Sequence, residues 1–254
     1  MSPRDVRVQN YRQRRFERVK PSAGYIILPE DPMFQSARKD FELEDKFANK
    51  FLAGKARLQD FPYYKSYVGT IKAEASLLPS PPRRMLFIGS GPVPLSAILF
   101  KREFPESAVD IADINLPALR KGARVARKAG TPLGKQLLGD AATMEGLRKY
   151  DAVVVSLEVG PTTSAKNSVI QNFAHQPGPI YLLRGSPPGR GGEAFVDTRS
   201  LLRPNMEVLG SVETFDGYGE TVAVRSRPLG SPRHYGEGPE SYEARTGFRY
   251  EDRA

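Results

Sequence analysis

A glycine-rich segment and an aspartate have the residue types and spacing of a nucleoside-binding site. The segment Gly89-Ser90-Gly91-Pro92-Val93-Pro94 follows an apolar run at 85–88 and opens a helical pattern. Glycine at 89 and 91 lets the backbone turn sharply and approach a ligand closely. Asp113 lies 22 residues after Gly91, at the end of the next apolar run. A carboxylate at this place can accept hydrogen bonds from both hydroxyls of a ribose.

A second carboxylate adds to this pattern. Asp140, followed by Ala141, comes after the expected third strand, near the place of an adenine amino group. A Gly-x-Gly turn also arises by chance, and an aspartate at a strand end often caps a helix. In a strand–helix context, however, the three features together favour an adenosyl ligand. Pro94 replaces the third glycine of the dinucleotide fingerprint and no Gly-Lys-Ser/Thr follows, which disfavours NAD, FAD and a P-loop.

Composition excludes several kinds of chemistry. The 254 residues include no cysteine and two histidines, His175 and His234, so thiolate zinc sites, iron–sulfur clusters and cysteine nucleophiles are excluded. We predict no metal. Hydrophobic residues make up 39% of the chain, enough for a packed core. No apolar run approaches the roughly 18–20 residues of a membrane span, and we expect a soluble, cytoplasmic protein.

The elements that must position these residues alternate between strands and helices. A helical pattern at 32–78 ends at Pro79-Ser80-Pro81-Pro82, the clearest domain boundary. Beyond it we expect strands at 85–88, 109–112, 152–157 and 180–183, helices at 95–101 and 116–129, and a hairpin of 208–215 with 221–227. This order predicts an α/β fold with a parallel, doubly wound sheet that ends in an antiparallel hairpin, which is the usual shape of an S-adenosylmethionine domain.

The net charge of +9 is divided between two parts of the chain. We predict a basic arm at 1–20, a helical domain at 21–80, an S-adenosylmethionine domain at 81–229 and a flexible tail at 230–254. The arm has the composition of a nucleic-acid contact, but a solvated N-terminal helix is the favoured interpretation and nucleic acid is an unlikely partner. The basic residues of 116–129 are interpreted as a solvated outer face.

Several motifs, in order over 61–227, resemble the nicotianamine synthases, a family that includes bacterial opine metallophore synthases. Phe61-Pro62-Tyr63-Tyr64-Lys65-Ser66-Tyr67 with Glu74 resembles their FPY[FY]xNYxxLxxxE segment, and 87–96 resembles their F[IV]GSGPLPLT loop. Further motifs of the family resemble four segments of this chain: Asp113-Ile114-Asn115, 150–154, 158–166 and 183–190. Three departures lie on the substrate side: Ser66 replaces an asparagine, Glu158 replaces an apolar residue, and 185–189 differs from Ser-Ala-His-Gly.

The resemblance implies a class I methyltransferase-like Rossmann sheet, parallel with an antiparallel terminal hairpin, plus a small helical N-terminal domain. It also implies S-adenosylmethionine as a co-substrate, transfer of its 3-amino-3-carboxypropyl group to a small amine or amino acid, and release of methylthioadenosine. Glu74 is the candidate base, because it lies two helical turns after Tyr67 on the same face. Arginine suits recognition of a carboxylate. The expected catalytic residues are Glu74, Tyr67 and Tyr64. The expected substrate-binding residues are Tyr63, Arg184, Ser186 and Arg190. The expected cofactor-binding residues are Gly89, Ser90, Gly91, Pro92, Pro94, Asp113, Ile114, Asp140, Ala141, Leu157 and Glu158.

Other functions remain open from the sequence. The amino group of S-adenosylmethionine can attack its own γ-carbon, which gives azetidine-2-carboxylate and methylthioadenosine with no acceptor. An ordinary methyltransferase is the next alternative. A nucleic-acid-binding protein that uses the basic arm is a different class, and salt-dependent binding to nucleic acid would favour it. A homodimer is a candidate assembly.

Overall fold

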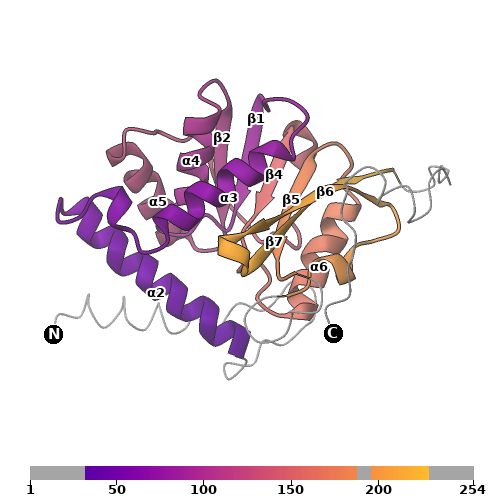
Figure 1. The fold of residues 1–254 in the computed structure, drawn as a ribbon, viewed down its shortest axis with the longest axis horizontal. Helices are drawn as coiled ribbons and strands as arrows, with labels where there is room; N and C mark the ends of the chain where they lie inside the picture. Colours follow the sequence, from indigo (N-terminus) through magenta and orange to yellow (C-terminus); the bar gives the residue numbers. More distant parts are fainter. Residues whose placement is uncertain (1–31, 188–195, 229–254) are drawn as a thin grey trace.

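The computed structural model describes residues 32–187 and 196–228 (Figure 1). The predicted arm at 1–20, the tail at 230–254 and Arg190 lie outside these residues. The strands are β1 (Arg84–Ile88), β2 (Ala108–Asp113), β3 (Gln136–Leu138), β4 (Ala152–Val155), β5 (Ile180–Gly185), β6 (Met206–Thr214) and β7 (Gly219–Ser226). The helices are α2 (Pro32–Leu52), α3 (Tyr64–Ser76), α4 (Leu95–Glu103), α5 (Leu116–Lys128) and α6 (Thr163–Ala174).

Within the described residues, seven strands form one sheet in the order β3-β2-β1-β4-β5-β7-β6. Strands β1 to β5 are parallel, β7 is antiparallel to β5, and β6 is antiparallel to β7. The predicted parallel sheet with an antiparallel terminal hairpin is therefore confirmed. The strand order reverses between β1 and β4, and ligands of such sheets bind at the carboxyl ends of the strands beside this point.

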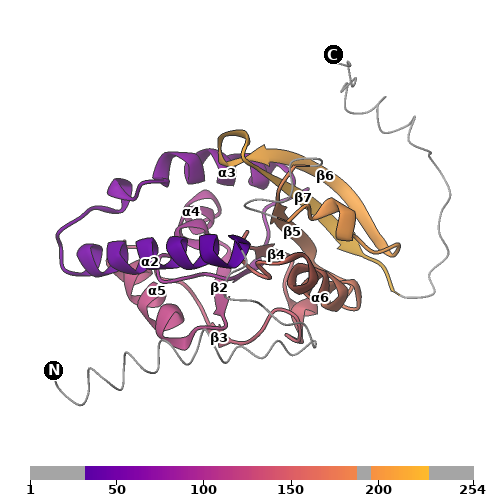
Figure 2. The same cartoon turned by 90° about the horizontal axis from the view of Figure 1, so that it is seen from below.

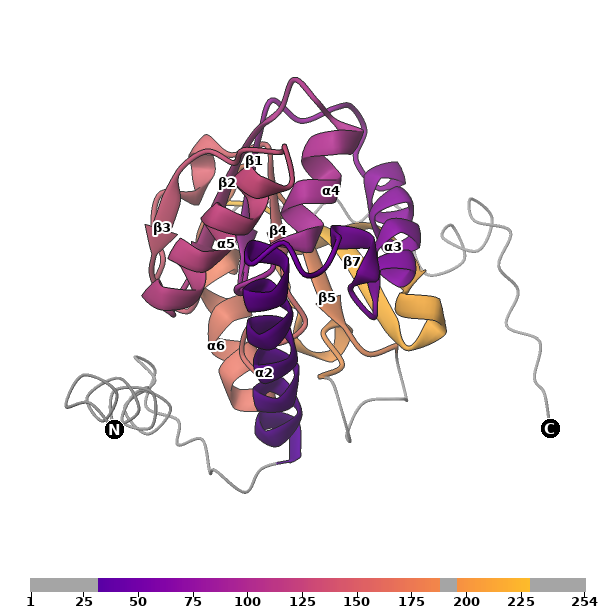
Figure 3. The ribbon, with the colours of Figure 1, turned by 90° about the vertical axis from the view of Figure 1, so that its left-hand side faces the viewer.

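Both faces of the sheet are covered, which explains why its central strands are apolar throughout. Met85 and Phe87 of β1 join one core cluster with residues of α2, α3, α4 and α5. The alternating Leu86 and Ile88 join a second cluster with α6 and the hairpin. Figures 2 and 3 show this arrangement, with α6 across the sheet from α4 and α5. The helices at 32–76 thus share a core with the sheet, and the predicted boundary between two domains stays a prediction.

Helix α2 is held at the carboxyl ends of the strands by packing and by charge. Phe47 and Phe51 are buried, and each contributes about 1.5–3 kcal/mol by leaving water. Lys121 of α5 forms an ion pair with Asp45 at 2.6 Å, and Lys128 donates to the Leu52 carbonyl at 2.8 Å. The interpretation of the α5 cations as a solvated face was therefore wrong for Lys121, whereas Lys128 is exposed and agrees with it. Their partners lie on a helix 72 or more residues earlier.

Among the described residues, no helix has both the length and the apolar composition that crossing a bilayer requires.

Candidate functional site

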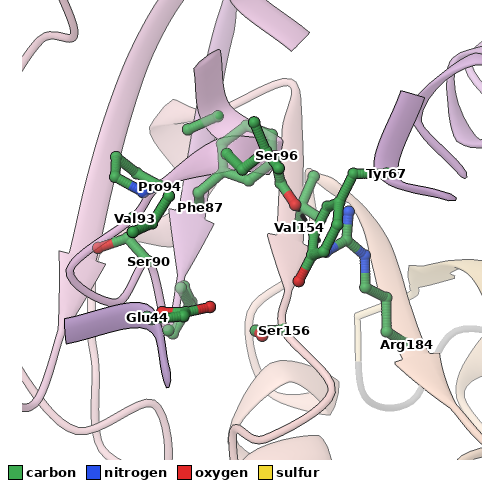
Figure 4. Close-up of a pocket in the computed structure, with 14 residues that line it drawn as sticks. Glu44, Tyr67, Phe87, Ser90, Val93, Pro94, Ser96, Val154, Ser156 and Arg184 are labelled. Atoms are coloured by element: carbon green, nitrogen blue, oxygen red, sulfur yellow. Dashed lines mark hydrogen bonds between the residues drawn. The ribbon is translucent and has the colours of Figure 1, made fainter. Parts of the chain in front are cut away.

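A pocket lies at the carboxyl ends of β1 and β4, where the strand order reverses. Its floor is formed by the loop after β1, the start of α4 and the end of β4. Figure 4 shows Glu44 of α2 on one side and Tyr67 of α3 with Arg184 of β5 on the other. The remaining lining residues include Gly89, Ser90, Val93, Pro94, Ser96, Val154 and Ser156. The helical layer and the sheet therefore both contribute polar groups to one pocket.

The loop after β1 needs glycine at two positions. Gly89 and Gly91 have φ values of +77° and +62°, a region that glycine occupies without steric strain. A Cβ at Gly89 would collide with Val159, and one at Gly91 would collide with the Glu44 carboxylate. The Gly91 N–H donates to Asp113 Oδ2 at 2.9 Å. The predicted aspartate thus lies beside the loop and fixes its course.

Glu44 is a functional candidate that the sequence reasoning missed. Burial, followed by the negative charges of Glu158, Asp113 and Asp40, raises the pKa of the Glu44 carboxyl well above its usual range. A hydrogen bond from the Val93 N–H offsets only part of this effect. A carboxyl group whose proton affinity is raised in this way, at the wall of a pocket, can act as a general base.

Glu158 is a second carboxyl group with altered proton affinity on this side of the pocket. It follows Ser156 and Leu157 after β4. Burial, together with the charge and a hydrogen bond of Asp40, raises the pKa of Glu158 to about 8. Burial lowers the pKa of Lys166, a residue of α6, to about 7. The Lys166 ammonium donates to the Leu157 carbonyl at 2.9 Å, so this lysine also holds the loop that carries Glu158.

The opposite wall contains a buried ion pair between Arg184 and Glu74. Arg184 Nε donates to Glu74 Oε1 at 2.7 Å, and Nη2 donates to Oε2 at 2.8 Å. The Thr221 hydroxyl donates to the same Oε1 at 2.6 Å. Arg184 and Glu74 are 2% and 0% exposed, so both oxygens of Glu74 are engaged away from water. This geometry shows that Glu74 holds Arg184 in place, and its predicted role as a base stays a prediction.

Arg184 faces the pocket within this network. Its Nη1 donates to Ser96 Oγ at 2.8 Å, and its guanidinium carbon lies 6.0 Å from the centre of the Tyr67 ring. Burial by itself lowers the pKa of Arg184, but the charge and hydrogen bonds of Glu74 outweigh it and the pKa is raised. Burial, with the charge of Glu44, raises the pKa of Tyr67 above its usual value. Both groups therefore remain protonated near neutral pH.

Comparison with known proteins identifies the family. The family model described as "Nicotianamine synthase protein" matches residues 35–221. The chain belongs to the nicotianamine synthase family. Nicotianamine synthase 1 of Oryza sativa subsp. indica is 32% identical over 187 residues, which cover 68% of this chain and 56% of that protein. Nicotianamine synthase 9 of Hordeum vulgare is 30% identical over 161 residues, which cover 59% of this chain and 47% of that protein.

The chain thus spans about half the length of the nicotianamine synthases that it matches. Solved structures share its fold. MtNAS in complex with MTA and tNA has a TM-score of 0.59 at 20% identity, covering 76% of this chain and 73% of that chain. The PH0226 protein from Pyrococcus horikoshii OT3 has a TM-score of 0.53 at 12% identity, covering 67% and 94%. The family resemblance and the fold class predicted from the motifs are confirmed.

The family motifs do not all meet at the pocket. Gly89, Ser90, Pro94, Tyr67 and Arg184 line it. The remaining predicted cofactor residues do not line it, but they end or follow β1, β2, β3 and β4 at the same edge of the sheet: Gly91, Pro92, Asp113, Ile114, Asp140, Ala141, Leu157 and Glu158. Tyr63, Tyr64 and Ser186 are not among the residues that line the pocket, and the Tyr63 side chain is 49% exposed.

A sequence signal for Glu44 existed in its helix. Phe47, Ala48 and Phe51 are buried, and they follow Glu44 at spacings of three, four and seven residues. These spacings place Glu44 on the apolar stripe that faces the sheet. A carboxylate on such a stripe is rare without a partner or a function, and this is the feature that identifies it.

Proposed function

We propose that this chain transfers the 3-amino-3-carboxypropyl group of S-adenosylmethionine to the nitrogen of a small amine or amino acid and releases methylthioadenosine. Membership of the nicotianamine synthase family supports this proposal, as do MtNAS structures with S-adenosylmethionine and with MTA. The observation that carries it is the pocket beside the glycine loop, in which Glu44, with a raised pKa, faces Tyr67 and Arg184.

The adenosyl part of the substrate would lie along the carboxyl ends of β1 to β3. Asp113 would accept hydrogen bonds from the ribose, and Asp140 with Ala141 would face the adenine. Two exposed apolar side chains, Ile114 and Leu138, follow or end the strands beside these aspartates, with 43% and 55% exposure. Apolar side chains next to carboxylates suit a flat base with a polar edge. The rest of the adenosyl-binding region would be formed by the loops after β1 and β4, with Gly89, Ser90, Gly91, Pro92, Pro94 and Leu157.

In the reaction, the acceptor nitrogen attacks the γ-carbon next to the sulfonium. The new C–N bond forms as the C–S bond breaks, and the electron pair of that bond remains on sulfur, which becomes a neutral thioether. The acceptor nitrogen loses one proton. We assign this proton to Glu44, because it lines the pocket and has a raised pKa. Glu74, the base expected from the sequence, is bonded through both oxygens to Arg184 and Thr221.

The charge change during transfer favours this assignment. While the sulfonium is present, its positive charge stabilises the ionised carboxylate of Glu44, which is the form that accepts a proton. When the sulfonium becomes a thioether, that stabilisation disappears and the proton affinity of Glu44 rises. The base is therefore available before transfer and retains the proton after it. The Tyr67 ring can also attract the sulfonium through a cation–π interaction.

Arg184 is positioned to bind the carboxylate of the aminocarboxypropyl group. Glu74, Ser96 and the backbone of β5 fix its guanidinium, so little conformational entropy remains to be lost on binding. We place the acceptor amine on the side of Glu44, a carboxyl group that Glu158 and Asp40 also influence. Ser186, Tyr63 and Tyr64 are further proposed substrate contacts, and Arg190, which lies outside the described residues, stays a prediction.

Mass spectrometry of the products tests the proposal. Purified protein is incubated with S-adenosylmethionine, with and without amino acids and amines. Methylthioadenosine that forms only with an acceptor supports transfer, whereas methylthioadenosine with azetidine-2-carboxylate and no acceptor identifies cyclisation. S-adenosylhomocysteine would refute both and identify a methyltransferase. Glu44→Gln is expected to abolish either alkyl reaction, and Glu42→Gln, on the exposed side of the same helix, serves as the matched control.

A further inference from the structure

The turn between β6 and β7 holds two adjacent non-glycine residues in a left-handed conformation. Phe215 has a φ of +51° and Asp216 a φ of +56°, and the described part of the chain has no other non-glycine residue with positive φ. A bulky side chain is a rare occupant of this region. Gly217 follows directly, so the turn already contains a glycine and Phe215 still takes the strained position. Such strain persists where surrounding contacts impose it, often beside functional sites.

Contacts with α3 impose this conformation. The Phe215 N–H donates to the Thr70 hydroxyl at 2.9 Å across 145 residues of sequence. The Phe215 ring meets the Tyr67 ring edge to face, with centroids 5.2 Å apart. Thr70 is 2% exposed, and it follows Tyr67 by three residues on the same face of α3. The turn is therefore bonded to the helix beside the tyrosine that lines the pocket.

Phe215 also contacts the second pocket residue of this wall. The guanidinium carbon of Arg184 lies 5.5 Å from the centre of the Phe215 ring. Glu74 and Ser96 occupy hydrogen-bonding edges of the same guanidinium, while the rings of Tyr67 and Phe215 lie within 6.0 Å of it. Phe215 itself is not among the residues that line the pocket. It can act on a substrate only through Tyr67 and Arg184.

We propose that Phe215 is a positioning residue, which the strained β6–β7 turn holds against Tyr67 and Arg184 so that both face the aminocarboxypropyl end of S-adenosylmethionine. This proposal rests on the proposed function, because that function assigns this end of the substrate to Arg184. It predicts that loss of the ring weakens contact with the aminocarboxypropyl group and leaves contact with the adenosyl group intact.

Binding of two ligands separates these effects. S-adenosylmethionine contains both parts, whereas methylthioadenosine lacks the aminocarboxypropyl group. Calorimetry with Phe215→Leu should give about a tenfold weaker Kd for S-adenosylmethionine and an unchanged Kd for methylthioadenosine, together with a reduced kcat. Phe215→Tyr retains the ring and should restore both values. Asp216→Gly relieves strain in the same turn without removing the ring, and it should leave both affinities unchanged.

Two results would overturn the proposal: unchanged affinities in Phe215→Leu, or equal loss of affinity for both ligands. The second result means that the ring only stabilises the fold. If Phe215→Leu does not fold, Thr70→Val removes the hydrogen bond to the turn and the ratio of the two Kd values is measured in its place. Wild-type protein that binds both ligands but releases no methylthioadenosine refutes the proposed transfer, while the ratio of Kd values still tests Phe215.

Discussion

The buried pair of Glu74 and Arg184 gives the sharpest separation between a structural and a catalytic role. Glu74→Gln keeps the shape of the side chain and removes its charge. The amide oxygen can still accept one hydrogen bond from Arg184, but the amide nitrogen is a donor that faces a guanidinium or hydroxyl donor. The arginine charge then remains at 2% exposure without its counter-ion.

The expected loss of stability is large. Removal of one member of a buried ion pair typically lowers the free energy of unfolding by about 3–5 kcal/mol. At about 2–4 °C for each kcal/mol in a domain of this size, the melting temperature should fall by roughly 10 °C. Urea unfolding followed by circular dichroism measures the free energy directly. Glu42→Gln is the control, because Glu42 is half exposed and its pair with Arg38 contributes little.

A compensating variant completes this experiment. Replacement of both members, Glu74→Gln with Arg184→Met, removes the isolated charge, and the free energy of unfolding should return to within about 1–2 kcal/mol of the wild-type value. Affinity for S-adenosylmethionine should not return, because Arg184 is absent. If Glu74→Gln instead keeps wild-type stability and substrate affinity but has no turnover, Glu74 is the proton acceptor and our assignment of Glu44 is wrong.

Three further predictions concern the opposite wall and the docking of α2. Glu44→Gln should lower turnover by at least about 100-fold. It should also raise the free energy of unfolding at neutral pH, because the raised pKa means that the fold disfavours the ionised carboxylate. A lower free energy in urea unfolding would contradict this reasoning. The stability of the wild-type protein should fall as the pH rises from about 4.5 to about 8, because over this interval Glu158 loses its proton in the unfolded chain and retains it in the folded protein. Thermal melts at several pH values measure this profile, and Glu158→Gln should flatten it. Lys121→Met should lower the free energy of unfolding by about 1 kcal/mol, and an unchanged melting temperature would show that the Lys121–Asp45 pair does not hold α2.

The sequence predicted the sheet well because its signals are local. Runs such as 85–88 and 152–155 are apolar on both faces, as strands between two helical layers must be. The prediction extended the second of these strands to 157, two residues too far. The hairpin of β6 and β7 was found from two apolar segments around Asp216-Gly217-Tyr218-Gly219. The position of the pocket then followed from the strand order, since ligands bind where that order reverses.

The features that the sequence did not reveal concern pairs of residues that are distant in sequence. Glu74 was predicted to be a base because it lies two helical turns after Tyr67 on the same face, and that role stays a prediction. Its ion pair with Arg184, 110 residues away, was not foreseen because no local pattern links the two. Likewise, Lys121 was predicted to lie on a solvated face, since its partner Asp45 lies 76 residues before it and no local pattern links the two. The left-handed Phe215 is a third case, since the hydrogen bond to Thr70 spans 145 residues. Charge partners and imposed strain depend on the assembled fold.

The distribution of charge in the pocket leads to a further test. Glu44 on one wall and Glu158, whose charge acts on Glu44, both have raised pKa values, while the charge of Arg184 on the other wall is balanced by Glu74. A sulfonium that enters this pocket adds a positive charge and lowers the proton affinity of the two carboxyl groups. Binding of S-adenosylmethionine near pH 7 should therefore release protons, and affinity should rise as the pH approaches 8.

Calorimetry in buffers with different ionisation enthalpies measures this release. Methylthioadenosine has no sulfonium charge, so its binding should release fewer protons, and Glu44→Gln should reduce the number released by S-adenosylmethionine. Equal proton release for the two ligands would mean that the sulfonium lies far from Glu44, and the role of this residue as proton acceptor would then be lost. The fold disfavours the ionised form of these carboxyl groups in the free protein, and a cationic substrate stabilises that form. The same electrostatic interaction that lowers the stability of the free protein therefore gives selectivity for a sulfonium.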